Sequence, residues 1–238
     1  MALLVDSSFR NNIECFQTSS LLGSLNDIEE RFSPKELFVL GDVSLLRDER
    51  RVAIIGTREP SSKGAIAAQK IAEFLVSHSV IIVSGLAKGV DTIAHKTAIS
   101  RGGRTVAVIG THPDKYYPKE NKELQDEIAK KHLIVSQFDS QSPIRPTNFP
   151  ARNRTMALLS QISVIVEAGE KSGTMHQGWE ALRLGRPLFI HEDLVNNKEL
   201  SWPSKLIEYG AETLYMDDLD LLLDYLPEKL TSNKVLLR

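Results

Sequence analysis

The sequence predicts an α/β protein built on a doubly wound, mainly parallel sheet with helices on both faces. Short runs rich in β-branched residues alternate along the chain with segments that have the apolar periodicity of helices. The runs are continuously apolar, as expected for strands that helices cover on both faces. Glycine-containing turns follow several of these runs, and right-handed crossovers bring such turns to one edge of a sheet.

The chain is expected to divide into three parts. Breakers such as Asn11-Asn12 and Ser33-Pro34 interrupt the first 45 residues, which predicts an irregular or short helical lead-in. Residues 46–228 form the expected core, and residues 229–238 a short tail. The strands expected in the core are Val52–Ile55, Ile81–Val83, Thr105–Ile109, Leu133–Ser136, Val164–Val166 and Pro187–Ile190.

Capping residues and glycines mark the helices between these strands. Ser61 and Ser62 precede apolar positions spaced three and four apart from Ala68 to Leu75, which predicts a capped helix. Asp91 and Asn121 are expected to cap the next two helices. The C-terminal part predicts a helix, a short strand near Thr213–Tyr215 and a leucine-rich helix from Leu219. The intervening helices are expected at 91–100, 121–131 and 174–184.

Composition limits the classes of function. The formal net charge of the 238 residues is −2, so a nucleic-acid site would need a local concentration of positive charge. The single cysteine, Cys15, excludes an internal disulfide framework and a multi-cysteine zinc site, and it suits a reducing cytoplasm. No apolar run approaches the roughly 20 residues of a membrane helix, and no signal peptide is apparent. We expect a cytoplasmic protein without membrane contact, metal or cofactor.

Two glycine turns are candidate anion sites. Gly56-Thr57-Arg58 follows the first core strand, where a glycine permits close approach of a ligand and an arginine can hold a phosphate. The turn lacks the glycines of a dinucleotide fingerprint and the Gly-Lys-Ser/Thr of a Walker loop, and a tight turn with an exposed arginine is the alternative. Ser84, Gly85 and Lys88 form the second turn. After it, Asp91 and His95 are four apart, and a helix cap with a packed histidine is favoured over acid–base chemistry.

A third turn and an arginine-rich segment complete the candidate set. Ser172, Gly173 and Thr174 open a helix and offer amides and hydroxyls to an anion, although an ordinary helix cap explains them equally well. Upstream, one segment joins an aromatic to two arginines that flank an amide, which could hold phosphates and stack a base. Its alternatives are a core aromatic and a surface salt-bridge pair. The segment consists of Phe149, Pro150, Ala151, Arg152, Asn153 and Arg154.

Together these stretches resemble the DNA-processing protein A family (DprA, also called Smf). The matching motifs occur in order from about Leu37 to Leu226, and only their ordered set is specific. They are Val52 to Arg58, Ser84 to Asp91 with Ala94-His95, Gly103 to Gly110, Asp114 to Pro118 with Asn121, Phe149 to Arg154, Ser172 to Thr174 and Gly185-Arg186.

The resemblance implies an extended Rossmann-like domain that binds single-stranded DNA and a homodimer that helps load a RecA-like recombinase during DNA uptake and recombination. By motif match, Arg58, Arg152, Asn153 and Arg154 resemble phosphate contacts, and Phe149 resembles the aromatic that meets a base. The chain departs from the family after Thr174, where Met175-His176-Gln177-Gly178 stands. We expect a core-only member, without full flanking domains.

Two other classes of function stay open. Phosphoribohydrolases of the cytokinin-activating type resemble this chain in a Gly-Thr turn at a helix start, but Gln177 stands where their motif has a catalytic glutamate. A purely protein-binding regulator is the third class. We expect no enzyme activity, and we expect a homodimer formed by the leucine-rich tail from Leu206 to Leu226.

Overall fold

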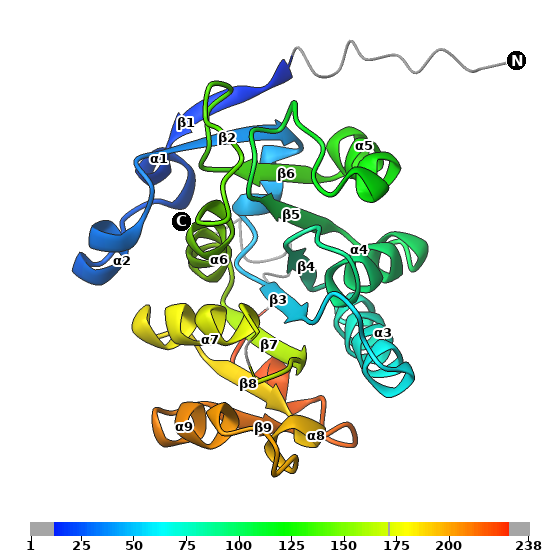
Figure 1. Cartoon of the computed structure of the whole chain (residues 1–238). Coiled ribbons are helices and arrows are strands. Elements are labelled where there is room, and N and C mark those ends of the chain that lie inside the picture. Colours follow the sequence, from blue (N-terminus) through cyan, green and yellow to red (C-terminus); the bar gives the residue numbers. More distant parts are fainter. Residues whose placement is uncertain (1–11, 171, 229–238) are drawn as a thin grey trace, which may run out of the picture.

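The strands of the protein form one sheet with a single block of parallel strands. In the computed structural model, which describes residues 12–170 and 172–228, the order is β1-β2-β6-β5-β4-β3-β7-β8-β9 (Figure 1). In this spatial order, β6, β5, β4, β3, β7, β8 and β9 run parallel to one another. Strand β2 pairs antiparallel with both β6 and β1. The strands are β1 Glu14–Gln17, β2 Glu36–Gly41, β3 Arg51–Gly56, β4 Ile81–Ser84, β5 Thr105–Ile109, β6 Leu133–Ser136, β7 Ile162–Glu167, β8 Leu188–His191 and β9 Glu212–Leu214.

Helices cover both faces of the sheet, because side chains alternate along each buried strand. Ala53 and Ile55 of β3 face a core that includes α6, α7 and α9, whereas Val52 and Ile54 face α3, α4 and α10. A smaller core lies under α5. The helices are α1 Thr18–Leu22, α2 Asp27–Phe32, α3 Ser62–Ser77, α4 Val90–Ser100, α5 Lys122–Lys131, α6 Asn148–Leu158, α7 Thr174–Arg183, α8 Glu192–Val195, α9 Trp202–Glu208 and α10 Leu221–Asp224. The predicted α/β, Rossmann-like fold is confirmed.

The expected lead-in belongs to the same sheet. Residues predicted to be irregular or helical contain β1 and β2, and Val39 of β2 pairs with Val135 of β6. Leu37 and Val39 are buried in the main core. The boundary expected near residue 46 therefore does not separate two bodies. The short tail predicted at residues 229–238 lies outside the described residues.

The arginine-rich segment is helical, which the sequence analysis did not predict. It forms the first part of α6, and Pro150 lies in the first turn, where a proline costs no hydrogen bond. Figure 1 shows α6 over one face of the sheet, close to α7. The segment thus presents two sides of a helix, rather than a continuous loop.

The leucine-rich tail packs against its own chain. Leu206, Leu214 and Leu222 have no exposed surface, and Leu226 is buried as well. The leucines between them pack against the core formed by α3 and α4. The excess of leucines, from which a dimer interface was predicted, is therefore explained within one chain. Within the described residues, no helix is both long enough and apolar enough to span a bilayer.

Candidate functional site

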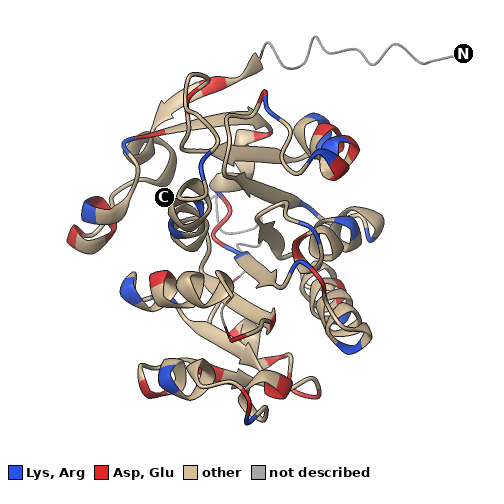
Figure 2. Cartoon of the chain, viewed as in Figure 1, with Lys and Arg blue, Asp and Glu red and all other residues tan. Residues whose placement is uncertain are grey.

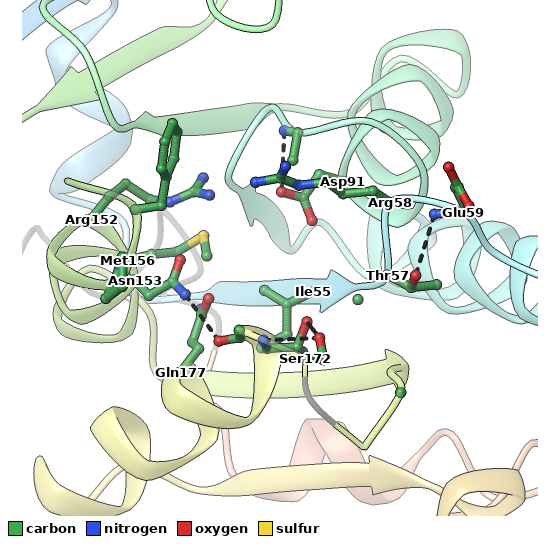
Figure 3. A pocket seen from close by; sticks show the side chains of 17 residues that line it. Ile55, Thr57, Arg58, Glu59, Asp91, Arg152, Asn153, Met156, Ser172 and Gln177 are labelled. Atoms are coloured by element: carbon green, nitrogen blue, oxygen red, sulfur yellow. Dashed lines mark hydrogen bonds between the residues drawn. The ribbon is translucent and has the colours of Figure 1, made fainter. Parts of the chain in front are cut away.

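The strand order places a crevice between β3 and β7. From β3 the chain winds to β4, β5 and β6 on one side, and from β7 it winds to β8 and β9 on the other. The carboxyl ends of two such strands are the usual ligand site of a doubly wound sheet. A cavity of about 560 Å³, here called the switch-point cavity, lies there (Figure 3). Its lining includes most of the predicted residues: Gly56, Thr57, Arg58, Phe149, Arg152, Asn153, Ser172, Gly173 and Thr174.

A second cavity, of about 640 Å³, adjoins the first and is here called the aromatic cavity. Arg58, Phe149 and Arg152 line both cavities, and Tyr117 lines only the second. The Phe149 ring lies 5.0 Å from that of Tyr117, centroid to centroid, at an interplanar angle of 36°. The backbone of Gly110 lies directly beneath, because a Cβ there would be 2.9 Å from Phe149 Cδ1. Tyr117 is a site residue that the sequence analysis missed, although it is part of a quoted family motif.

Helix α6 sends its two arginines to opposite sides. Residues two apart on an α-helix are separated by about 200°, whereas residues three apart share a face. Phe149 and Arg152 therefore face the cavities together. Arg152 is 6% exposed, and its Nη1 donates a hydrogen bond to the carbonyl of Val108 at 2.9 Å. It is a buried cation rather than the surface salt-bridge partner that the alternative interpretation proposed.

Arg154 faces away from the cavities, which corrects its predicted place beside Arg58. Its Nε donates to Glu180 Oε2 at 3.0 Å, and its guanidinium carbon lies 5.4 Å from the ring centroid of Phe32. Arg183 contacts the same carboxylate and the same ring. The alternative of a salt-bridge arginine is therefore correct at this position, and Arg154 lines neither cavity.

Arg58 is exposed, and it has no ion-pair partner within the described residues. Its guanidinium carbon lies 5.9 Å from the ring centroid of Phe149. Figure 3 shows the Arg58 and Arg152 side chains approaching one another from opposite walls of the switch-point cavity. Burial, and to a lesser degree the positive charge of Arg58, lowers the pKa of Arg152, while Asp91 opposes this shift. Two like charges that face the same cavity favour an anion between them.

The first glycine turn is held by a carboxylate of the protein itself. Glu167, at the end of β7, accepts a hydrogen bond from the amide of Ser61 at 3.0 Å, at the start of α3. Gly64 makes room for it, because a Cβ there would be 1.7 Å from Glu167 Oε2. Ser61 caps α3 as predicted, its hydroxyl accepting from the Gly64 amide at 3.1 Å. The amide directly before α3 is therefore occupied by a carboxylate of the chain itself.

The second glycine turn is filled in the same way. The Asp91 carboxylate accepts from the amides of Gly85 at 3.2 Å and Ala87 at 3.3 Å. Burial raises the pKa of Asp91, whereas Arg152 lowers it. Asp91 is not the helix cap that was predicted, since α4 begins at Val90 and Gly89 precedes it with φ of 74°.

Other residues predicted near this turn have structural roles or lie at its edge. Ser84 is fully buried and donates to the carbonyl of Ile54 at 2.6 Å, so it ties β4 to β3 and lines neither cavity. His95 is buried beside Thr105, which confirms the packed-histidine alternative. Lys88 is exposed at the aromatic cavity, where its ammonium group pairs with Glu120 at 2.6 Å.

The third turn has a neutral serine hydroxyl at the start of α7 and a buried side-chain amide beside it. Ser172 Oγ accepts from the Thr174 amide at 3.1 Å, and Asn153 Nδ2 donates to the Gly173 carbonyl at 3.4 Å, joining α6 to this turn. Gln177, one turn into α7, also lines the switch-point cavity and is 1% exposed. Among the described residues, no group of three or more His, Cys, Asp and Glu side chains is placed to hold a metal ion.

Comparisons with known proteins agree with this geometry. Residues 19–225 match the sequence profile of the family described as DNA recombination-mediator protein A. The DNA processing protein DprA of Streptococcus pneumoniae is 38% identical over 92% of this chain and 78% of its own length. The Bacillus subtilis protein of that name is 33% identical over 82% of this chain, which spans 65% of it.

A solved structure gives the same result. DNA processing protein A from Helicobacter pylori, whose single-stranded DNA binding mode that structure addresses, is 31% identical to this chain with a TM-score of 0.74. The match covers 91% of this chain and 98% of the Helicobacter chain. Together with the strand order, the ordered motifs and a family match over most of the sequence, this places the chain in the DNA-processing protein A (DprA/Smf) family.

Proposed function

We propose that the chain binds single-stranded DNA across the two adjoining cavities and does so without catalysis. One observation carries the proposal: Arg58 and Arg152 converge beside the Phe149–Tyr117 ring pair. Cations next to aromatic rings are what a single strand needs, because phosphates and bases alternate along it. The Helicobacter relative, whose structure concerns single-stranded DNA binding, supports the same assignment.

Each group has a distinct task in this proposal. Arg58 is exposed and has no ion-pair partner among the residues that the structure describes, so its planar fork can hold two oxygens of a phosphate. Arg152 adds positive charge from beneath, where solvent screens it less. Phe149, half-buried over Gly110, offers a ring face for a base, a contact worth about 1–3 kcal/mol.

The cations of this site are local. Figure 2 shows basic and acidic positions interspersed along most of the helices. That distribution agrees with the net charge of −2. A strand is therefore expected to bind through few phosphates, with affinity that falls moderately as salt rises.

Catalysis finds little support in the lining residues. Asp91 is engaged by two backbone amides, and Glu59 is exposed at the rim. Gln177 occupies the position at which a nucleotide hydrolase of the related group has its glutamate, and an amide cannot act as a carboxylate base. The proposal extends to delivery of the strand to a RecA-like recombinase by a homodimer, as the family resemblance implies.

The test is a fluorescence-anisotropy titration with labelled oligo-dT at two salt concentrations. We expect Arg58→Ala to weaken binding by about tenfold or more. The slope of log affinity against log salt should flatten by roughly 0.7 for each phosphate that the variant no longer neutralises. The matched control is Arg101→Ala, which removes the same charge from a residue that pairs with Glu73 and lines neither cavity. Equal affinity and equal salt slope for the Arg58 and Arg101 variants would contradict the proposal.

A further inference from the structure

Two buried polar atoms beside the switch-point cavity have no hydrogen-bond partner within the described residues. They are Arg152 Nε and Gln177 Nε2. Arg152 is 6% exposed and Gln177 is 1% exposed, and both line the cavity. Buried donors are nearly always paired in native proteins, so two orphaned donors at one cavity indicate an absent acceptor.

The start of α7 adds to this preference for an acceptor. α7 has 10 residues, long enough for a dipole; its N-cap residue is Gly173, and the only side-chain group that the described residues place on its first amide is the neutral hydroxyl of Ser172. Among the described residues, the Glu167 carboxylate instead accepts from the Ser61 amide at the start of α3, and the Asp91 carboxylate accepts from two amides of the turn that precedes α4. Ser172 Oγ also donates to Thr174 Oγ1 at 2.9 Å, which leaves the Thr174 hydroxyl hydrogen available to a ligand.

From these observations we infer that the switch-point cavity holds the phosphomonoester of a nucleotide, either the phosphorylated 5′ end of a strand or a free mononucleotide. The inference rests on the proposed function. A monoester carries about −1.5 to −2 charge at pH 7 and three acceptor oxygens, whereas a diester inside a strand carries one charge and two free oxygens. Arg58, Arg152 and Gln177 supply more donors than a single diester needs.

The arrangement of the two cavities fits a terminal nucleotide. They share Arg58, Phe149 and Arg152, so a base in the aromatic cavity can keep its 5′-phosphate in the switch-point cavity. The volume of about 560 Å³ lies within the roughly 300–1,000 Å³ of small-ligand sites. Asp91 also lines the cavity, but its carboxylate already faces the amides of Gly85 and Ala87.

The experiment compares oligo-dT carrying a 5′-phosphate with oligo-dT carrying a 5′-hydroxyl, both labelled at the 3′ end, by fluorescence anisotropy. We expect the protein to bind the phosphorylated strand about tenfold more tightly. Calorimetry with dTMP forms the second arm. Binding of dTMP without an end preference assigns the cavity to the free nucleotide, and an end preference assigns it to the strand.

Two variants test whether Gln177 carries the effect. Gln177→Glu keeps the volume of the side chain but adds a negative charge. Gln177→Met removes the hydrogen-bond donor without adding a charge. Both are expected to bring the ratio of the two affinities close to one and to abolish dTMP binding, with folding verified by circular dichroism and thermal melting. Arg101→Ala should retain the ratio of the unaltered protein.

The outcomes separate this inference from the proposed function. Equal affinity for the two strands together with no dTMP binding overturns the phosphomonoester site, while binding of the 5′-hydroxyl strand keeps the proposed function intact. A protein that binds neither strand contradicts the proposed function itself. Gln177 variants that fold and keep the full end preference also overturn the inference.

Discussion

The guanidinium group of Arg152 occupies the space that a side chain at Gly85 would need. A Cβ built on Gly85 falls 1.5 Å from Arg152 Nη1 and 2.3 Å from its Cζ. The glycine of the second turn is therefore required by an arginine of the same chain, which it allows to reach Val108 from α6. Its role in the site is indirect, because it positions the buried cation.

Replacing Gly85 should consequently disturb both stability and binding. The backbone at Gly85 lies outside the left-handed region, so Gly85→Ala acts only by displacing Arg152. We expect a loss of about 1–3 kcal/mol in the free energy of unfolding and roughly tenfold weaker binding of oligo-dT. Urea unfolding and anisotropy measure the two effects. Gly169→Ala, where a Cβ meets nothing within 4 Å, is the stability control and should change little.

The ring of Phe149 should contribute by stacking. Phe149→Ala removes the ring that faces Tyr117 and Arg58, and we expect a loss of about 1–3 kcal/mol in binding free energy. Phe149→Trp keeps an aromatic face and should recover most of the affinity. Anisotropy with oligo-dT compares the three proteins, and an alanine variant that binds like the tryptophan variant would exclude stacking at this position.

Arg154 offers a direct test of the correction made by the structure. Because it faces Glu180 and Phe32, Arg154→Ala should leave oligo-dT affinity within about twofold, while Arg58→Ala does not. The partly exposed ion pair contributes little, so the free energy of unfolding should fall by about 1 kcal/mol or less. A tenfold loss of affinity in the Arg154 variant would show that Arg154 contributes to DNA binding after all.

His95 should make stability depend on pH. Its Nδ1 lies 2.7 Å from Thr105 Oγ1. Because the Thr105 hydroxyl donates to the Ile82 carbonyl, it accepts from Nδ1, which therefore carries the proton, and the buried Nε2 is unprotonated. Burial lowers the pKa of His95 from 6.5 to about 3. Between pH 6.5 and 3 the unfolded chain takes up a proton that the folded chain does not, so stability falls as pH falls through this window.

The slope from this one group approaches about 1.4 kcal/mol per pH unit. His95→Gln removes the titrating group but keeps a donor for Thr105, and it should flatten the decline. Urea unfolding of both proteins at intervals from about pH 4.5 to 7.5, which covers the upper part of the window and the plateau above it, gives the comparison. Parallel curves for the two proteins would show that His95 does not couple stability to pH.

Leu222 distinguishes a core role from an interface role for the leucine-rich tail. It is fully buried among residues of α3 and α4, so Leu222→Ala should cost about 2–5 kcal/mol in the free energy of unfolding. The oligomeric state, measured by sedimentation at equal concentration, should be that of the unaltered protein. A change of oligomeric state without a loss of stability would instead support the predicted dimer interface in the leucine-rich tail.

The sequence predicted the parallel strands well, because each is a continuous apolar run that only burial on two faces explains. It failed at β2, where Leu37–Leu40 is equally apolar but adds to the sheet in the antiparallel direction by long-range pairing. It failed again at α6, since Phe149 to Arg154 has no apolar period and contains a proline. Without the helix, nothing indicated that Arg152 and Arg154 point in opposite directions.

The composition of the site was predictable, but the partners of its charges were not. Glycine turns after strands are local signals, and they located the switch-point cavity correctly. Glu167 and Asp91 fill two of these turns from within, and Glu167 is 106 residues away in the sequence from the Ser61 amide that it accepts from. Such pairing depends on the folded sheet, so the sequence could not show which of the turns is filled by a carboxylate of the chain itself.

The internal carboxylates have a kinetic consequence for recognition. Hydrogen bonds to the Glu167 and Asp91 carboxylates hold two of the glycine turns within the chain itself, so under the proposed function little ordering would accompany DNA binding. Under the proposed function, a DNA strand would meet a preformed site. The association rate would then be set by diffusion and charge attraction more than by rearrangement of the protein.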